Sequence, residues 1–230
     1  MKIDRLLVVL YFVLCFMVGV FSVFRLSEII LYLKGAIVLV VALIFFVQNT
    51  KFSPIVAIIL LLSFFGETYY LYVKSYTETI PIVLFLCINL IFLVLSWLDV
   101  KEKEWSKTEF FKLLVLMGLL SVFAYSILSL DFKNTDVNFI LYIIYSIVFV
   151  VMFILSFASF VKTHQTSKLY LVLFGISVFV SDLSFLLNNY FIKLAFLRIG
   201  GNLSQVLGYY LMMRYFLESN KIEEFIKFED

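Results

Sequence analysis

Long apolar runs separated by short polar turns fill the chain. A membrane-spanning helix needs about 20 largely apolar residues, and this length predicts eight such helices. We expect them at about residues 5–25, 29–48, 53–73, 79–98, 109–130, 137–161, 168–190 and 198–217. The start of the last helix is the least clear, because Gly200, Gly201 and Asn202 interrupt the apolar pattern. The pattern predicts an all-α membrane bundle.

The first apolar run extends from Leu6 to Phe24 and follows two basic residues, as in a signal peptide. It is longer than the usual apolar core of a signal peptide, and no A-x-A-like cleavage site follows it. We therefore interpret it as a retained helix.

Composition supports the membrane class. Apolar residues make up 64% of the 230 residues and charged residues only 15%, and the mean hydropathy is +1.10. These values lie far outside the range of soluble domains. The chain has only two prolines and eight glycines, which leave no flexible linker. We expect a single domain over residues 1–230.

Charge and metal-binding residues exclude several function classes. The net charge of +2 is spread over the loops without a basic patch, so nucleic acid is not an expected partner. His164 is the only histidine, and Cys15 and Cys87 lie inside apolar runs. No metal site and no cofactor are therefore expected. Lysines and arginines are more frequent on the side of the N-terminus, which predicts cytoplasmic N- and C-termini, in a bacterial cytoplasmic membrane.

Two carboxylic acids interrupt the apolar helices. Asp182 lies in the run GISVFVSDLSFLLNNY, and Glu67 lies in LSFFGETYYLY. An ionisable side chain near a bilayer centre costs about 2.5 to 3.5 kcal/mol, so such a residue usually faces the protein interior or a wet cavity. With eight helices, the expected helices at 53–73 and 168–190 run in the same direction across the membrane. Each acid then lies about 20 Å from the start of its helix. We expect both at one depth, with Asn89 at a similar level.

The two acids also lie half a chain apart, each in the third helix of a four-helix half. This spacing suggests a duplicated four-helix unit, in which equivalent helices meet at a shared interface. We hold the duplication as a hypothesis.

Polar residues near the acids have structural and functional interpretations. Glu67 is either a structural acid bonded to Asn89, Tyr69 or Lys34, or part of a site with Asp182. Lys34, near the outer end of its helix, either extends to the surface or pairs with an inward carboxylate. Tyr69 and Tyr209 can donate hydrogen bonds into a cavity.

A pair of carboxyls in an apolar interior favours a division of roles, with one protonated and the other ionised. That division suits acid catalysis of an acetal-like or enol ether bond. Proton or cation coupling uses similar residues. The spacing alone leaves both chemistries open.

Several motifs together resemble one known family. They are the lysine in LYLKGAIVLV, the LLSFFGETYYLY run, the FGISVFVSDLSFLLNNYF run and the closing SQVLGYYLMMRYFLES. With the eight-helix layout, they are similar to the YhhN family, which includes the animal TMEM86 lysoplasmalogenases. The family has Gly-Asp in the third helix, Ser-Asp in the seventh and Lys-Pro in the second.

The resemblance implies hydrolysis of the vinyl ether bond of a lysolipid substrate in the membrane, without a metal. It makes Glu67 and Asp182 the catalytic pair, with Glu67 the expected acid and Asp182 the base, although the reverse stays open. Lys34 would hold the lipid phosphate near the outer surface. The further expected substrate-binding residues are Asn89, Tyr69, Ser181, Gln205 and Tyr209.

This chain departs from the family pattern at three positions. Glu67 replaces an aspartate, Gly35 replaces the proline, and Asn89 stands where some relatives have a histidine. Two alternatives therefore stay open. One is a proton-coupled transporter of small lipids or solutes, and the other is a non-catalytic membrane subunit of the same fold. The sequence makes no prediction of oligomeric state.

Overall fold

A computed structural model describes residues 2–48, 53–73, 79–100, 106–128 and 139–219, and within these ranges the regular structure is entirely helical. The helices are α1 (Lys2–Val23), α2 (Ser27–Gln48), α3 (Pro54–Tyr72), α4 (Thr79–Val100), α5 (Lys107–Leu128), α6 (Phe139–Thr163), α7 (Thr166–Leu186) and α8 (Ala195–Glu218), with a π-helical turn η1 (Leu187–Phe191) after α7. The predicted helices correspond one to one with these, and the expected ends at residues 130 and 137 lie outside the described residues.

Six of the helices in the described ranges are long and apolar enough to cross a membrane, and α5 and α8 are not among them. The all-α membrane class is confirmed, whereas the prediction of eight spans is not. In α8 the reason is visible in the sequence, because Arg198, Asn202 and Gln205 lower the apolar content of its first half. Gly200 and Gly201, which made the start of this helix unclear in the sequence, lie inside α8, since the helix begins at Ala195, three residues before the expected start.

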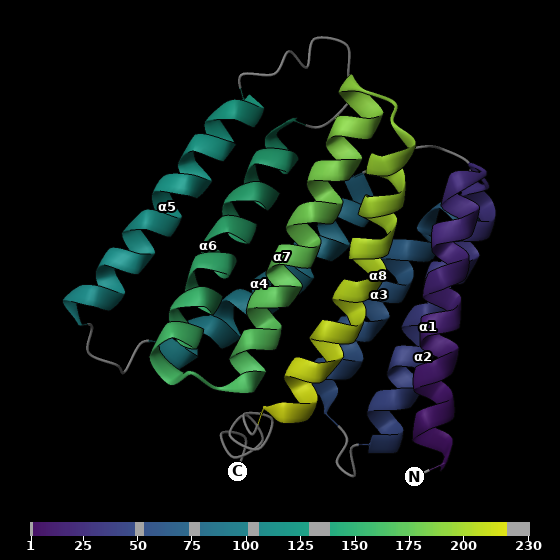
Figure 1. Ribbon diagram of the computed structural model, residues 1–230, viewed down its shortest axis with the longest axis horizontal. Coiled ribbons are helices and arrows are strands. Elements are labelled where there is room, and N and C mark those ends of the chain that lie inside the picture. The colour runs from purple at the N-terminus through teal and green to yellow at the C-terminus, as the bar shows by residue number, and fades with distance from the viewer. Residues whose placement is uncertain (1, 49–52, 74–78, 101–105, 129–138, 220–230) are drawn as a thin grey trace.

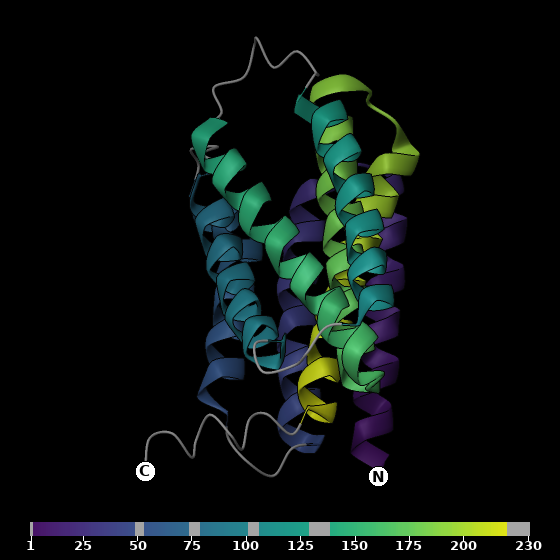
Figure 2. The same cartoon turned by 90° about the vertical axis from the view of Figure 1, so that its left-hand side faces the viewer.

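The helices form a bundle. Figure 1 shows α7 and α8 in front of α4 and α3, with α5 at one edge beside α6 and α1 at the other. Figure 2, turned by 90°, shows that α6 is inclined to the other helices of the bundle. The first residues of α1 and the last residues of α8 lie at the same end of the bundle. Their placement on the cytoplasmic side stays a prediction, and Lys51, Lys74, Lys101, Lys103, Lys133, Lys221 and Lys227, which contribute to it, lie outside the described residues.

Apolar side chains fill the interior and also cover the outside of the bundle. Tyr11, Phe45 and Phe92 are fully buried, whereas Phe16 and Phe196 are among many large apolar residues that are exposed. An apolar exterior of this extent is costly in water and is expected of a surface that faces lipid. The chain is an integral membrane protein.

Gly35 allows α2 and α3 to pack closely. A Cβ atom at this position would lie 2.7 Å from Cγ2 of Thr68, which is closer than such atoms approach. The close packing places Lys34, the residue before Gly35, on the side of α3 that carries Glu67.

A buried ion pair joins the helices at another place. Lys168 Nζ on α7 lies 2.6 Å from Asp99 Oδ2 on α4, and Ser159 on α6 donates a hydrogen bond of 3.2 Å to the same carboxylate oxygen. Lys168 Nζ also lies 5.3 Å from the centre of the Tyr215 ring on α8. This cluster ties together α4, α6, α7 and α8.

Candidate functional site

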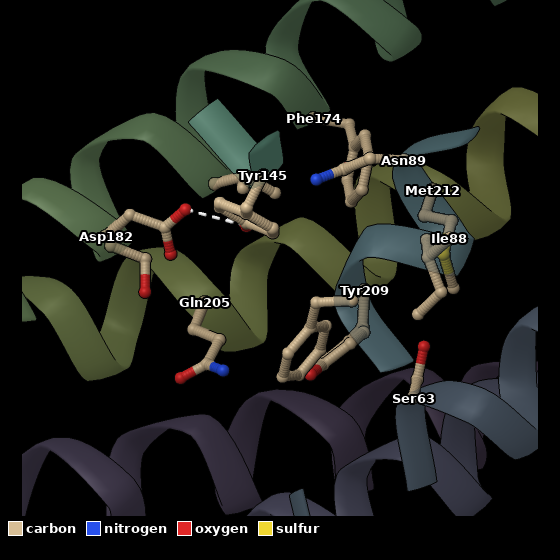
Figure 3. A pocket seen from close by; sticks show the side chains of 12 residues that line it. Ser63, Ile88, Asn89, Tyr145, Phe174, Asp182, Gln205, Tyr209 and Met212 are labelled. Atoms are coloured by element: carbon tan, nitrogen blue, oxygen red, sulfur yellow. Dashed lines mark hydrogen bonds between the residues drawn. The ribbon is translucent and has the colours of Figure 1, made fainter. Parts of the chain in front are cut away.

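Side chains from α3, α4, α6, α7 and α8 line a cavity of about 60 Å³ (Figure 3). Its apolar wall includes Ile88, Phe174 and Met212. Its polar wall consists of Ser63, Asn89, Tyr145, Ser181, Asp182, Gln205 and Tyr209. A concentration of polar groups inside an apolar membrane bundle is costly unless those groups bond to one another, to water or to a ligand. The cavity is therefore the candidate functional site.

Asp182, on α7, lines the cavity as the sequence predicted for an acid in an apolar helix. Its Oδ2 atom accepts a hydrogen bond of 2.8 Å from the Tyr145 hydroxyl on α6, which Figure 3 marks with a dashed line. Among the described residues, no lysine or arginine lies within ion-pair distance of this carboxyl. Within the described part of the chain, Asp182 therefore has a hydroxyl partner and no charged one.

Glu67, on α3, is 4% exposed and sits directly behind the cavity wall. Its Oε1 atom accepts hydrogen bonds from the Tyr209 hydroxyl and, at 2.5 Å, from Gln205 Nε2. Both donors line the cavity. Glu67 thus reaches the site through these two side chains.

Lys34 is also buried, and its ammonium group faces the interior. The Nζ atom lies 3.8 Å from Glu67 Oε2 and donates a hydrogen bond of 2.5 Å to Gln205 Oε1. Of the two alternatives for this lysine, the structure has the pairing with an inward carboxylate. The proposed contact with a lipid phosphate has no support in this placement.

Two side chains of α8 connect Glu67 to the cavity that Asp182 lines. Gln205 and Tyr209 are four residues apart and so project from the same face of the helix. Both amide atoms of Gln205 are used, one toward Lys34 and the other toward Glu67. Asp182 lines the cavity itself, and among the described residues no hydrogen bond joins it directly to Glu67. That the two acids form one functional site stays a prediction.

Of the three remaining residues that were expected to bind substrate, two line the cavity and one does not. Asn89 on α4 and Ser181 on α7 are part of the polar wall and are buried. The Asn89 Nδ2 atom has no hydrogen-bond partner in the described part of the chain. Tyr69 is not a lining residue, and its ring lies edge-on to Tyr70 with centroids 5.7 Å apart.

Sequence reasoning missed Tyr145, the direct partner of Asp182. It lies in an apolar run that contains one other tyrosine, Tyr142, and nothing in the sequence distinguishes the two. Ser63 was not expected at the site either, and its hydroxyl donates a hydrogen bond of 2.8 Å to the Ile59 carbonyl within α3. It also lines the cavity.

Within the described residues, no three His, Cys, Asp or Glu side chains gather in an arrangement that would hold a metal ion. Comparison of the chain with protein-family models, curated proteins and solved structures finds no match. The resemblance to the YhhN family therefore stays a hypothesis that rests on the motifs.

Proposed function

We propose that this chain is a membrane-embedded hydrolase that cleaves the vinyl ether bond of lysoplasmalogen-like lysolipids by acid–base chemistry. The observation that supports it most is the asymmetry of two intramembrane acids around one polar cavity. Asp182 lines the cavity with only a hydroxyl partner, whereas Glu67 stands behind the wall next to a lysine.

Charge balance suggests which acid holds the proton. Glu67 as a carboxylate and Lys34 as an ammonium form a neutral pair, and Gln205 and Tyr209 satisfy the carboxylate further. Asp182 has no such counter-charge among the described residues, and an uncompensated charge in an apolar interior is costly. We therefore assign Asp182 as the acid, which reverses the role expected from the sequence.

The reaction begins with transfer of the Asp182 proton to the β-carbon of the vinyl ether. The carbon–carbon double bond becomes a single bond, and the positive charge is shared between the α-carbon and the ether oxygen. The new Asp182 carboxylate stabilises this oxocarbenium ion electrostatically. Water then adds to the α-carbon and gives one proton to the Asp182 carboxylate. The product of this addition is a hemiacetal.

Collapse of the hemiacetal completes the reaction. The carbonyl forms as the bond from the α-carbon to the ether oxygen breaks. The ether oxygen takes the Asp182 proton, and the hydroxyl proton passes through water to the Asp182 carboxylate and restores the acid. The products are a fatty aldehyde and the glycerophospho-head group. Positioned acid–base catalysis of this kind contributes typically about 10²- to 10⁴-fold in rate.

The remaining residues hold the site in place. Glu67 fixes the orientation of Gln205 and Tyr209, and Lys34 neutralises Glu67. The cavity of about 60 Å³ is smaller than a lysolipid, so the fatty chain and head group would extend beyond it. We further propose eight spans with cytoplasmic termini in a bacterial cytoplasmic membrane.

The test is aldehyde release by the purified protein in lipid vesicles that contain a lysoplasmalogen. A lysolipid with a saturated ether at the same position is the matched control, because it lacks the double bond that accepts the proton. Release from the vinyl ether alone supports the proposal. Equal release from both substrates, or release from neither, contradicts it.

A second candidate is proton-coupled transport of a small lipid or solute. The observation that favours it is the run of titratable side chains from Lys34 and Glu67 through Tyr209 to the cavity and Asp182. Chains of such residues inside a membrane often serve as proton paths. Proton-dependent uptake without aldehyde formation would favour this function, and the absence of both activities would favour a non-catalytic subunit.

A further inference from the structure

Asn89 has a buried hydrogen-bond donor that lies near the Tyr145 hydroxyl but makes no hydrogen bond of normal geometry with any described residue. The residue is 2% exposed and lines the cavity from α4. Its Nδ2 atom has no partner within the described residues, and Figure 3 shows the amide nitrogen on the side of the cavity that faces Tyr145. Buried polar atoms are almost always hydrogen-bonded, so an exception calls for a partner from outside the chain.

The partner of Asn89 must be a small acceptor. An amide NH₂ group donates hydrogen bonds and does not accept them. The cavity measures about 60 Å³, whereas one water needs roughly 10 to 15 Å³ of such volume together with two to four polar partners. The carboxyl of Asp182 and the hydroxyls of Tyr145 and Tyr209 line the same cavity and supply those partners. Water meets both the size and the chemistry.

We propose that Asn89 binds the water molecule that is the second substrate of the reaction. This inference rests on the proposed function and names the group that positions its nucleophile. The amide donates one hydrogen bond to the water oxygen and leaves a lone pair for the α-carbon of the oxocarbenium ion. The new carbon–oxygen bond forms from that lone pair, and the π electrons of the oxocarbenium ion return to the ether oxygen. One proton of the water goes to the Asp182 carboxylate.

The first test is a high-resolution structure of the wild-type protein and of Asn89→Leu. The proposal expects an ordered water within about 3 Å of Nδ2 in the wild type, and none at that place in the leucine variant. A dry cavity, or a direct Asn89 to Tyr145 hydrogen bond that fills the donor, would overturn it. This readout does not depend on activity.

The second test uses methanol as a competing nucleophile. Methanol that captures the oxocarbenium ion gives a mixed acetal, so the ratio of acetal to aldehyde reports how well water is held. The proposal expects Asn89→Ala to raise this ratio several-fold over wild type. Ile88→Ala is the control, because Ile88 lines the same cavity from the same helix without a polar group, and its ratio should stay near the wild-type value.

The two tests separate the two proposals. If Asn89→Ala and Ile88→Ala give the same ratio while the wild type releases aldehyde, the proposed function stands and the role of Asn89 is wrong. If the wild type releases no aldehyde, the proposed function fails, and the role of Asn89 as the residue that positions a reacting water fails with it. A water at Nδ2 in the structure would then remain as a binding site only.

Discussion

Lys34 and Glu67 form an ion pair inside the bundle, with Nζ 3.8 Å from Oε2 and both side chains less than a tenth exposed. Gln205 bridges them, since it accepts a hydrogen bond from the lysine and donates one to the glutamate. Breaking a buried pair by removing one partner leaves an uncompensated charge, whereas removing both is often nearly neutral. The pair therefore makes a prediction that a double substitution can test.

Glu67→Gln is expected to lower the stability of the protein by about 3–5 kcal/mol, because it leaves the Lys34 ammonium buried without a counter-charge. Adding Lys34→Met should recover most of that loss. Thermal unfolding of the purified variants in one detergent measures both. A double variant no more stable than Glu67→Gln would show that the charge pairing is not what holds these helices together.

Gly35→Ala is expected to destabilise the protein by about 1–3 kcal/mol, because the new methyl group collides with Cγ2 of Thr68. Thr68→Ser removes that carbon and keeps the hydroxyl that donates to the Phe64 carbonyl. The serine substitution should therefore offset much of the cost of alanine at position 35. Additive effects of the two substitutions in a double-mutant cycle would argue against this contact.

Asp99→Asn separates stability from chemistry. It removes the carboxylate that lies 2.6 Å from Lys168 Nζ, and we expect a loss of about 3–5 kcal/mol, as for Glu67→Gln. Asp99 does not line the cavity. At a temperature where both variants are folded, Asp99→Asn should retain aldehyde release and Glu67→Gln should lose most of it. Equal activities in the two variants would remove Glu67 from the site.

Tyr145→Phe tests the partner of the proposed acid. The substitution removes the hydroxyl that donates to Asp182, at a cost to stability of about 0.5–1.5 kcal/mol. The orientation of the Asp182 carboxyl is no longer fixed, so kcat for aldehyde release should fall while KM changes little. A large rise in KM with unchanged kcat would instead indicate that Tyr145 contacts the substrate.

Helix positions were predictable because a membrane helix is recognised by length and apolar content, and both are visible in the sequence. The cost of a buried charge likewise identified Glu67, Asp182 and the inward alternative for Lys34. The network among them was less visible, because it depends on α8 lying between α3 and α7. Gln205 and Tyr209 were expected to bind substrate, whereas the structure also gives them the task of connecting Glu67 to the cavity.

Tyr145 shows a second limit. A tyrosine in an apolar helix can face lipid, the core or a cavity, and only the crossing of α6 with α7 decides which. Tyr69 is the opposite case, since its place two residues after Glu67 suggested the site, but the helical turn directs it away from the cavity wall.

Aldehyde release by purified Asp182→Asn, beside the wild type on one lysoplasmalogen, tests the account most directly. The asparagine oxygen still accepts the hydrogen bond from Tyr145, so the fold should be retained, but the side chain has no acidic proton. We predict that release falls by at least about 10²-fold while thermal unfolding stays near the wild-type temperature. Full release by a folded Asp182→Asn protein would contradict the assignment of Asp182 as the acid and, with it, the proposed mechanism.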